Sequence, residues 1–405
     1  MYEASLFYQN TQSANYIKYK LIMSKKRKPY FNNNVVNPIH TSATYFFEDT
    51  EQVIRYHDKK EEVGRYGRYD NPNWLEVEEK LATLDLCEDA LVFPSGMSAI
   101  ATTLMSLSEN GKKIIYTGKG YRNIRNLCGN ILAKFGIETI SLSPANAKQF
   151  IIEFKKHYDA NTSVVFLEIP SNPHLHLVDV EEVKKIIKDD TILIIDSTFS
   201  SPINFLPIRW GADLVIHSCG KYIGGHADIM AGSVAGKKDI IEKIRNYRNV
   251  LGNIVDSHTA FMLNRSIATL KMRIEYLNQA GLKLATFLES HPKVKKVFYS
   301  GLASYSNRDL AKKYLSGHGG VVTFELNLSK KATTNFVDAL KIPYMGTNFG
   351  SCHSMVEQCS IFTYYKEPQE VRNDLGISDT LIRYSIGFDN IDDIINDINE
   401  ALEKA

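Results

Sequence analysis

The run LVIHSCGKYIGGH at residues 214–226 decides the fold of this chain. It begins with a short apolar stretch, which is typical of a strand that is covered on both faces of a sheet. Ser218 and Lys221 follow directly, and a glycine pair at 224–225 then lets the backbone turn sharply. A lysine just past a buried strand can be partly desolvated, which lowers its pKa and frees its amine to attack a carbonyl. The run therefore predicts a buried strand that ends beside a reactive lysine.

A second run, ILIIDSTF at residues 192–199, has the same character and ends its apolar stretch with Asp196. A lysine and a carboxylate at the ends of two successive strands fit pyridoxal 5′-phosphate (PLP). The lysine forms a Schiff base with the cofactor's aldehyde, and the carboxylate pairs with the protonated ring nitrogen. Taken alone, Lys221 is better explained as a solvated side chain and Asp196 as a turn cap. Together the two runs favour the cofactor.

The composition is that of an ordinary globular protein and excludes several partners. The chain has 405 residues, of which 44% are hydrophobic and 23% charged, with a net charge of +2. Such a small net charge predicts no nucleic-acid partner, and the basic run at 25–28 is interpreted as a solvated tail. No apolar stretch reaches the roughly 20 residues that span a bilayer, so no membrane partner is expected. No cleavable signal is visible, and Met23 is a second candidate initiator that would leave residues 1–22 as an extension.

The five cysteines are odd in number and show no paired spacing. This pattern predicts reduced thiols and a cytoplasmic location. No CxxC or His-x-x-His spacing indicates a metal site, so none is expected.

Short apolar runs that alternate with helical patterns predict a doubly wound α/β domain with a mostly parallel sheet. In such sheets ligands bind beyond the carboxyl ends of the strands, where Asp196 and Lys221 stand. Helices are expected over 74–81, 124–134 and 180–188, besides the helix that opens after Ser95. The predicted strands are 90–93, 113–117, 138–141, 164–169, 192–196, 214–217 and 232–235.

A long helical stretch at 257–288 is expected to connect this domain to a smaller α+β domain. The smaller domain has predicted strands at 293–299, 321–326 and 381–386, and helices at 333–340 and 389–402. The predicted organisation is an extension and intersubunit arm at 1–60, a PLP-binding domain at 61–256 and a C-terminal unit at 257–405.

Two further segments have residues that suit a phosphate. Gly96 and Met97 follow a predicted strand and open a helix, where free N–H groups bind anions, although a plain helix cap is the commoner explanation when this motif is taken alone. Tyr66 and Arg68 lie together ahead of the first core helix, and arginine suits bidentate phosphate binding.

With these motifs the chain resembles the PLP-dependent Cys/Met metabolism (transsulfuration) family of fold-type I, and within it the cystathionine γ-synthase branch. The resemblance covers about residues 37–402. The motifs that carry it are RYGRYDNP at 65–72, SGM at 95–97, PSNP at 170–173, DSTF at 196–199, HSCGKYIGGH at 217–226 and FVDALKIPY at 336–344.

The resemblance implies roles for the residues singled out above. Lys221 would hold PLP and then act as an acid–base, while Asp196 would keep the ring nitrogen protonated. Tyr66 and Arg68 would reach the phosphate of a neighbouring subunit, so a dimer is the minimum and a homotetramer is expected. The remaining assignments are the stacking residue Tyr121, the phosphate contacts Gly96, Met97 and Ser218, the ring contact Asn172, and the substrate contacts Asn348 and Arg383.

Several positions depart from the family pattern, and three of them bear on the phosphate and the substrate. Gly220 stands where a threonine usually helps to hold the phosphate, and Asn348 replaces a serine at the substrate mouth. His353 replaces a glutamate that recognises the distal part of the substrate. These departures put the exact substrate in doubt.

The resemblance implies γ-replacement of an activated homoserine ester by cysteine, giving L-cystathionine for methionine biosynthesis. Carbon–sulfur lysis, as in cystathionine lyases, would use the same residues and stays open. Methionine γ-lyases carry a cysteine where Asn123 stands, which makes that activity a weaker alternative. A PLP-binding protein with little catalysis, retained for regulation, is a third interpretation.

Overall fold

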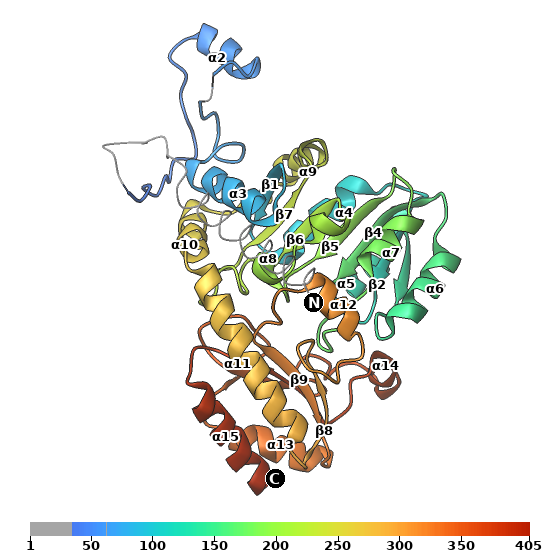
Figure 1. Cartoon of the computed structure of the whole chain (residues 1–405). Coiled ribbons are helices and arrows are strands. Elements are labelled where there is room, and N and C mark those ends of the chain that lie inside the picture. The colour runs from blue at the N-terminus through green and yellow to red at the C-terminus, as the bar shows by residue number, and fades with distance from the viewer. Residues whose placement is uncertain (1–34, 62) are drawn as a thin grey trace, which may run out of the picture.

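The computed structural model describes residues 35–61 and 63–405. Met23, the basic run at 25–28 and the proposed extension at 1–22 lie outside these residues. Of the predicted arm, helix α2 (Thr50–His57) extends away from the rest of the molecule (Figure 1). Residues 37–40 instead lie against α3 (Pro72–Asp85), where Asn73 Nδ2 donates to the Pro38 carbonyl at 2.8 Å.

The larger sheet has seven strands in the order β1-β7-β6-β5-β4-β2-β3. Four of its pairings, from β6 through β5, β4 and β2 to β3, are parallel, whereas β7 runs antiparallel to both β6 and β1. The predicted α/β class with a mostly parallel sheet is confirmed. The strands are β1 (Asp89–Phe93), β2 (Lys113–Thr117), β3 (Glu138–Leu142), β4 (Thr162–Glu168), β5 (Ile192–Asp196), β6 (Leu214–His217) and β7 (Gly232–Gly236).

Helices cover both faces of this sheet (Figure 1). Strand β5 shows why: Ile194 packs in a cluster with residues of α4 and α9, whereas Leu193 and Ile195 pack on the other face with α6 and α7. Strands that are buried on both faces do not alternate apolar and polar residues, which explains the continuous apolar runs in the sequence. The helices are α3 (Pro72–Asp85), α4 (Gly96–Leu107), α5 (Arg122–Asn126), α6 (Ala147–His157), α7 (Val180–Ile186), α8 (Ser201–Asn204) and α9 (Lys238–Leu251).

Two predicted helices are irregular in the structure. In place of one helix over 124–134, α5 ends at Asn126 and is followed by a π-helical turn at Leu127–Ile131 and a 3-10 turn at Leu132–Phe135. Glycine and asparagine residues in this segment are weak helix formers. The stretch over 257–288 is divided into α10 (Ser257–Ile267) and α11 (Leu270–Ser290). At the break, the Ser266 carbonyl accepts from the Thr269 N–H at 3.2 Å and from Arg273 Nη2 at 2.9 Å.

The smaller sheet has five strands in the order β10-β11-β12-β9-β8, and α11 runs across it (Figure 1). The sequence missed two of them, because β10 has only two residues and β11 is short and half polar. The strands are β8 (Val294–Phe298), β9 (Val321–Leu326), β10 (Tyr344–Met345), β11 (Met355–Gln358) and β12 (Leu381–Ser385). The helices are α12 (Arg308–Tyr314), α13 (Lys330–Ala339), α14 (Gln369–Leu375) and α15 (Ile391–Lys404).

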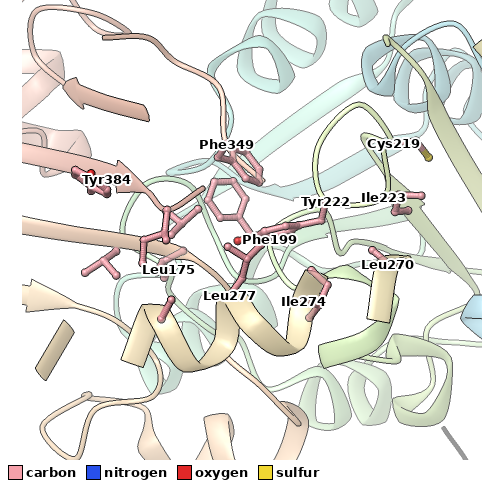
Figure 2. Packing of buried hydrophobic residues seen from close by; sticks show 14 of the residues in the cluster. Leu175, Phe199, Cys219, Tyr222, Ile223, Leu270, Ile274, Leu277, Phe349 and Tyr384 are labelled. Atoms are coloured by element: carbon pink, nitrogen blue, oxygen red, sulfur yellow. The ribbon is translucent and has the colours of Figure 1, made fainter. Parts of the chain in front are cut away.

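One hydrophobic cluster joins the loops of the larger sheet to the smaller sheet. Figure 2 shows Phe199, which follows β5, facing Phe349 from the segment before β11, with Tyr222 beside them. The ring centroids of Phe199 and Phe349 lie 4.1 Å apart, and those of Tyr222 and Phe349 5.7 Å apart. This packing fixes the loop that carries Lys221 against the smaller sheet. The exact domain boundaries at 60 and 256 stay a prediction.

Candidate functional site

A cavity of about 710 Å³ opens at the carboxyl ends of the larger sheet's strands and reaches β12 of the smaller sheet. Nine of the predicted site residues line it, although the sequence separates them by up to 287 positions. They are Gly96, Met97, Tyr121, Asn172, Asp196, Ser218, Lys221, Asn348 and Arg383. Their individual roles stay predictions.

Lys221 stands in the turn that the glycine-rich run predicts. Its backbone N–H donates to the Ser218 carbonyl at 3.1 Å, and its carbonyl accepts from Gly225 N at 2.7 Å. The Nζ atom donates a hydrogen bond to Asn348 Oδ1 and lies 5.3 Å from the centroid of the Phe349 ring. Burial and the positive charge of Arg383 lower the pKa of Lys221 to about 8, against the opposing charge of Glu357. A substantial fraction of the amine is therefore unprotonated near neutral pH, as a nucleophile requires.

Asp196 ends β5 and is buried at the floor of the cavity. Its Oδ1 accepts from the backbone N of Thr198 at 2.9 Å and from Thr198 Oγ1 at 2.5 Å. Thr198 Oγ1 also accepts from Ser218 N at 2.9 Å, so the two strand ends are tied together. Burial raises the pKa of Asp196, while these hydrogen bonds act against the rise. Among the residues that the structure describes, Asp196 forms no ion pair with a lysine or arginine, and such a buried carboxylate suits a protonated ring nitrogen.

The N-terminus of α4 forms a cradle beside Ser218. Ser95 caps the helix, accepting from Ser98 N at 3.0 Å. A Cβ on Gly96 would lie 2.8 Å from Ser218 Cβ, so only glycine leaves this space open. Free N–H groups of the first turn and the Ser218 hydroxyl suit a phosphate. Gly220, the departure from the family's threonine, has a steric reason, because a Cβ there would lie 2.8 Å from the Ile229 carbonyl oxygen.

Arg383 is held by three acceptors. Its Nη1 donates to Asn172 Oδ1 at 2.9 Å, and its Nη2 donates to the Thr347 carbonyl at 2.6 Å. Glu357, its register partner on β11, lies 2.8 Å from Nη2, and both side chains are at most 3% exposed. Thr363 Oγ1 in turn donates to Glu357 at 2.6 Å. A fixed, buried guanidinium suits a substrate carboxylate.

Tyr66 and Arg68 do not line the cavity of their own chain. Arg68 Nη1 donates to the Asn249 carbonyl at 2.6 Å, and its guanidinium lies 4.8 Å from the centroid of the Tyr69 ring. Tyr66 is 43% exposed. Their expected contact with a neighbouring subunit's phosphate stays a prediction.

His353 also lies outside the cavity lining. Its ring packs edge-on against Tyr344, with centroids 5.7 Å apart. Asn348 is the departure that touches the reactive amine. Asn348 and His353 both depart from the family pattern, and of the two only Asn348 forms a hydrogen bond with Lys221.

Sequence reasoning missed Glu168, Glu357 and Arg122. Glu168 ends β4, lines the cavity and is 3% exposed. Burial and the nearby Asp196 charge raise the pKa of Glu168 to about 8. The sequence did carry a signal for Glu168, because it is an acidic residue at the end of a buried strand, as Asp196 is. Glu357 gave no such signal, because its pairing with Arg383 arises only from strand register.

Arg122 follows Tyr121 and lines the cavity with a partly exposed side chain. Its Nη1 donates to the Thr363 carbonyl at 3.2 Å. Arg122 and Arg125 lie 3.6 and 3.5 Å from the same carboxylate oxygen of Glu367. Of these three side chains only Arg122 lines the cavity, so it places one positive charge at this edge.

The residues that line the cavity fit PLP. The Gly96 cradle leaves room for a phosphate, the buried Asp196 carboxylate suits the pyridine nitrogen, and the Lys221 amine lies in the same cavity. Among residues 35–61 and 63–405, no group of three or more His, Cys, Asp or Glu side chains is arranged to hold a metal ion. Nor does any described helix have the length and apolar character that a membrane span requires.

The model of the family described as "Cys/Met metabolism PLP-dependent enzyme" matches residues 19–403. The chain therefore belongs to this family, whose fold-type I architecture and PLP cofactor it shares. It is 39% identical over 373 residues to cystathionine gamma-synthase 1, chloroplastic, of Arabidopsis thaliana, covering 91% of this chain and 65% of that protein. It is 36% identical over 378 residues to the probable cystathionine gamma-synthase 2 of the same plant, covering 93% and 91%.

Among solved structures, the crystal structure of a cystathionine gamma-lyase from Micromonospora echinospora superposes with a TM-score of 0.87 at 29% identity. The match covers 95% of this chain and 98% of that one. Both synthases and a lyase thus resemble this chain closely, which supports carbon–sulfur chemistry without selecting one reaction.

Proposed function

We propose that this chain is a transsulfuration enzyme that forms L-cystathionine by γ-replacement. Cysteine sulfur bonds to Cγ of an O-activated homoserine, the Cγ–O bond breaks, and the thiol proton balances the acid that is released. The relatives named as cystathionine γ-synthases support this reaction. The observation that carries the proposal is that a lysine with a lowered pKa and a buried arginine line one cavity with the cofactor residues.

PLP, when bound, supplies the electron sink that makes carbon–hydrogen and carbon–oxygen cleavage possible at the amino acid. Lys221 anchors the cofactor and then carries protons, because its pKa of about 8 lies near the working pH. Arg383 binds the α-carboxylate of the amino acid and is kept in place by Glu357 and Asn172. Asp196 supplies the negative charge at the ring nitrogen.

The guanidinium of Arg122 lines one side of the cavity, next to Glu367. A positive charge here favours an ester whose acyl or phosphoryl group already carries a negative charge, such as a succinyl or phospho ester, over the uncharged acetyl ester.

The site is completed by a second copy of the chain, with Tyr66 and Arg68 reaching the partner's phosphate, and the assembly is a homotetramer. The five cysteines are free thiols in the structure, which supports a cytoplasmic location. Light scattering of the purified protein tests the homotetramer, and fractionation of cell extracts tests the cytoplasmic location.

A carbon–sulfur lyase is the second candidate function, and the similarity to the γ-lyase structure favours it. Lys221, Asp196 and Arg383 would serve elimination equally well. A weakly catalytic, regulatory PLP protein is the third candidate, motivated by Gly220, Asn348 and His353.

Product analysis with purified holoenzyme distinguishes the three. O-acetyl-, O-succinyl- and O-phosphohomoserine are each supplied with and without cysteine, and cystathionine is supplied alone, with Lys221→Ala protein as the blank. Cystathionine formed from an ester and cysteine, faster than keto acid from cystathionine alone, supports γ-replacement. Faster release of pyruvate or 2-oxobutyrate supports the lyase, and no turnover of any substrate supports the regulatory protein.

A further inference from the structure

Glu168 occupies a position that the reaction above does not use. It is the register partner of Asp196 on the adjacent parallel strand, so the two carboxylates project from the same end of the sheet on the same face. Its side chain is buried in the cavity wall. In the part of the chain that the structure describes, no lysine or arginine forms an ion pair with it within 4 Å. A buried acid without an ion pair needs other hydrogen-bond donors.

These donors come from two separate loops. Glu168 Oε2 accepts from the backbone N of Tyr121 at 2.6 Å, and Oε1 accepts from the backbone N of Asn172 at 2.7 Å. The loop before Tyr121 lies directly on the carboxylate, because a Cβ on Gly120 would lie 2.4 Å from Oε2. Strand β4 itself is fixed below this point, where Glu168 N donates to Thr117 Oγ1 at 2.9 Å.

Tyr121 and Asn172 are both expected to contact the cofactor ring. The Tyr121 side chain is 40% exposed. It is the N-cap of α5 but makes no side-chain cap bond, and α5 has only five residues before it changes to a π-helical turn. A short, irregular helix does little to fix the residue that precedes it. The hydrogen bond to Glu168 is therefore a main restraint on the backbone of Tyr121.

We propose that Glu168 is a positioning residue for the cofactor, which joins the loops of Tyr121 and Asn172 through one carboxylate and so fixes both against the PLP ring. Its effect is exerted through these two residues and not by contact with the substrate. The inference rests on the family's use of PLP and is independent of whether the reaction is replacement or elimination.

The test compares Glu168→Ala, Glu168→Gln and a matched control, Glu78→Gln. Glu78 is also a buried acid that accepts from a backbone N–H, that of Val92 at 3.0 Å, but it pairs with Arg248 and does not line the cavity. Three quantities are measured on protein reconstituted with PLP: the dissociation constant of PLP by equilibrium dialysis, the visible circular dichroism of the bound cofactor, and the thermal unfolding midpoint.

Glu168→Ala is expected to weaken PLP binding by about tenfold or more, because the hydrogen bonds to two buried backbone N–H groups are lost, and to reduce the dichroism of the bound ring. Glu168→Gln keeps one acceptor oxygen, so its PLP affinity and dichroism should lie between those of the wild type and Glu168→Ala. Glu78→Gln should lower the unfolding midpoint while leaving PLP affinity and dichroism unchanged.

Unchanged PLP affinity and dichroism in Glu168→Ala would overturn the proposal, as would equal losses in Glu78→Gln. If Glu168→Ala does not fold, the PLP affinity and dichroism of Glu168→Gln are compared with those of Glu78→Gln. A loss of dichroism confined to Glu168→Gln supports the assignment, and an equal effect in both variants contradicts it.

Discussion

Replacing Arg383 with methionine should raise the pKa of the Lys221 amine. That pKa is lowered to about 8 by burial first and by the Arg383 charge second, while Glu357 raises it. In Arg383→Met the lowering charge is gone and Glu357 loses its partner. Both changes move the pKa upward from about 8. Burial, the largest cause, is retained, so the pKa should stay below the ordinary value of 10.5.

The size of the effect follows from the fraction of free amine. At pH 8, a group with a pKa of about 8 is half unprotonated, whereas at the ordinary value only about 0.3% would be, a ratio of roughly 150. Each unit by which the substitution raises the pKa reduces the free amine at pH 8 by roughly five- to tenfold. The apoenzyme should therefore react with PLP correspondingly more slowly at this pH.

The assay is the initial rate of PLP attachment to apoenzyme, followed by visible absorbance from pH 6 to 11. The double variant Arg383→Met/Glu357→Gln is the control, because it removes the raising charge as well. Its midpoint should lie between those of the wild type and Arg383→Met. A wild-type midpoint above about 10, or a midpoint in Arg383→Met at or below that of the wild type, would refute the reasoning.

Three further substitutions test the site. Gly96→Ala should weaken PLP binding about tenfold or more, because the new Cβ would lie 2.8 Å from Ser218 Cβ and force the phosphate cradle to shift, and this overlap should also lower the unfolding midpoint despite the better helix propensity of alanine; equilibrium dialysis showing unchanged affinity would contradict this. Glu357→Ala should reduce the free energy of unfolding by about 3–5 kcal/mol, because it leaves the Arg383 charge buried and unpaired; a loss below about 1 kcal/mol in urea denaturation would show that the pair is not needed. Asp196→Asn should reduce kcat by about 10²–10³ with PLP still bound, because the ring nitrogen loses its anionic partner; steady-state kinetics with unchanged kcat would count against that role.

The larger sheet could be predicted from the sequence because its strands are buried on both faces. Runs such as ILIID at 192–196 have no polar residue until the strand ends, and the carboxylate then marks the binding edge. The smaller sheet was predicted less completely, because β10 and β11 are defined by their partners and not by their own composition.

The site was predicted where local motifs carry its chemistry, and was missed where only tertiary contacts do. Lys221, Asp196 and Gly96 follow strands that the sequence reveals, so their meeting in one cavity follows from parallel topology. Glu357 acquires its role from its register with β12, and Glu168 from its contact with the Tyr121 loop, which lies more than forty residues before it. No spacing rule links such residues along the chain.

The most direct test of the account is to reduce the purified holoenzyme with borohydride and map the pyridoxyl group on its peptides. The account predicts a single modified lysine at position 221, in the peptide that contains HSCGKYIGGH. A colourless protein without an adduct, or a pyridoxyl group on another lysine while Lys221 is unmodified, would contradict it.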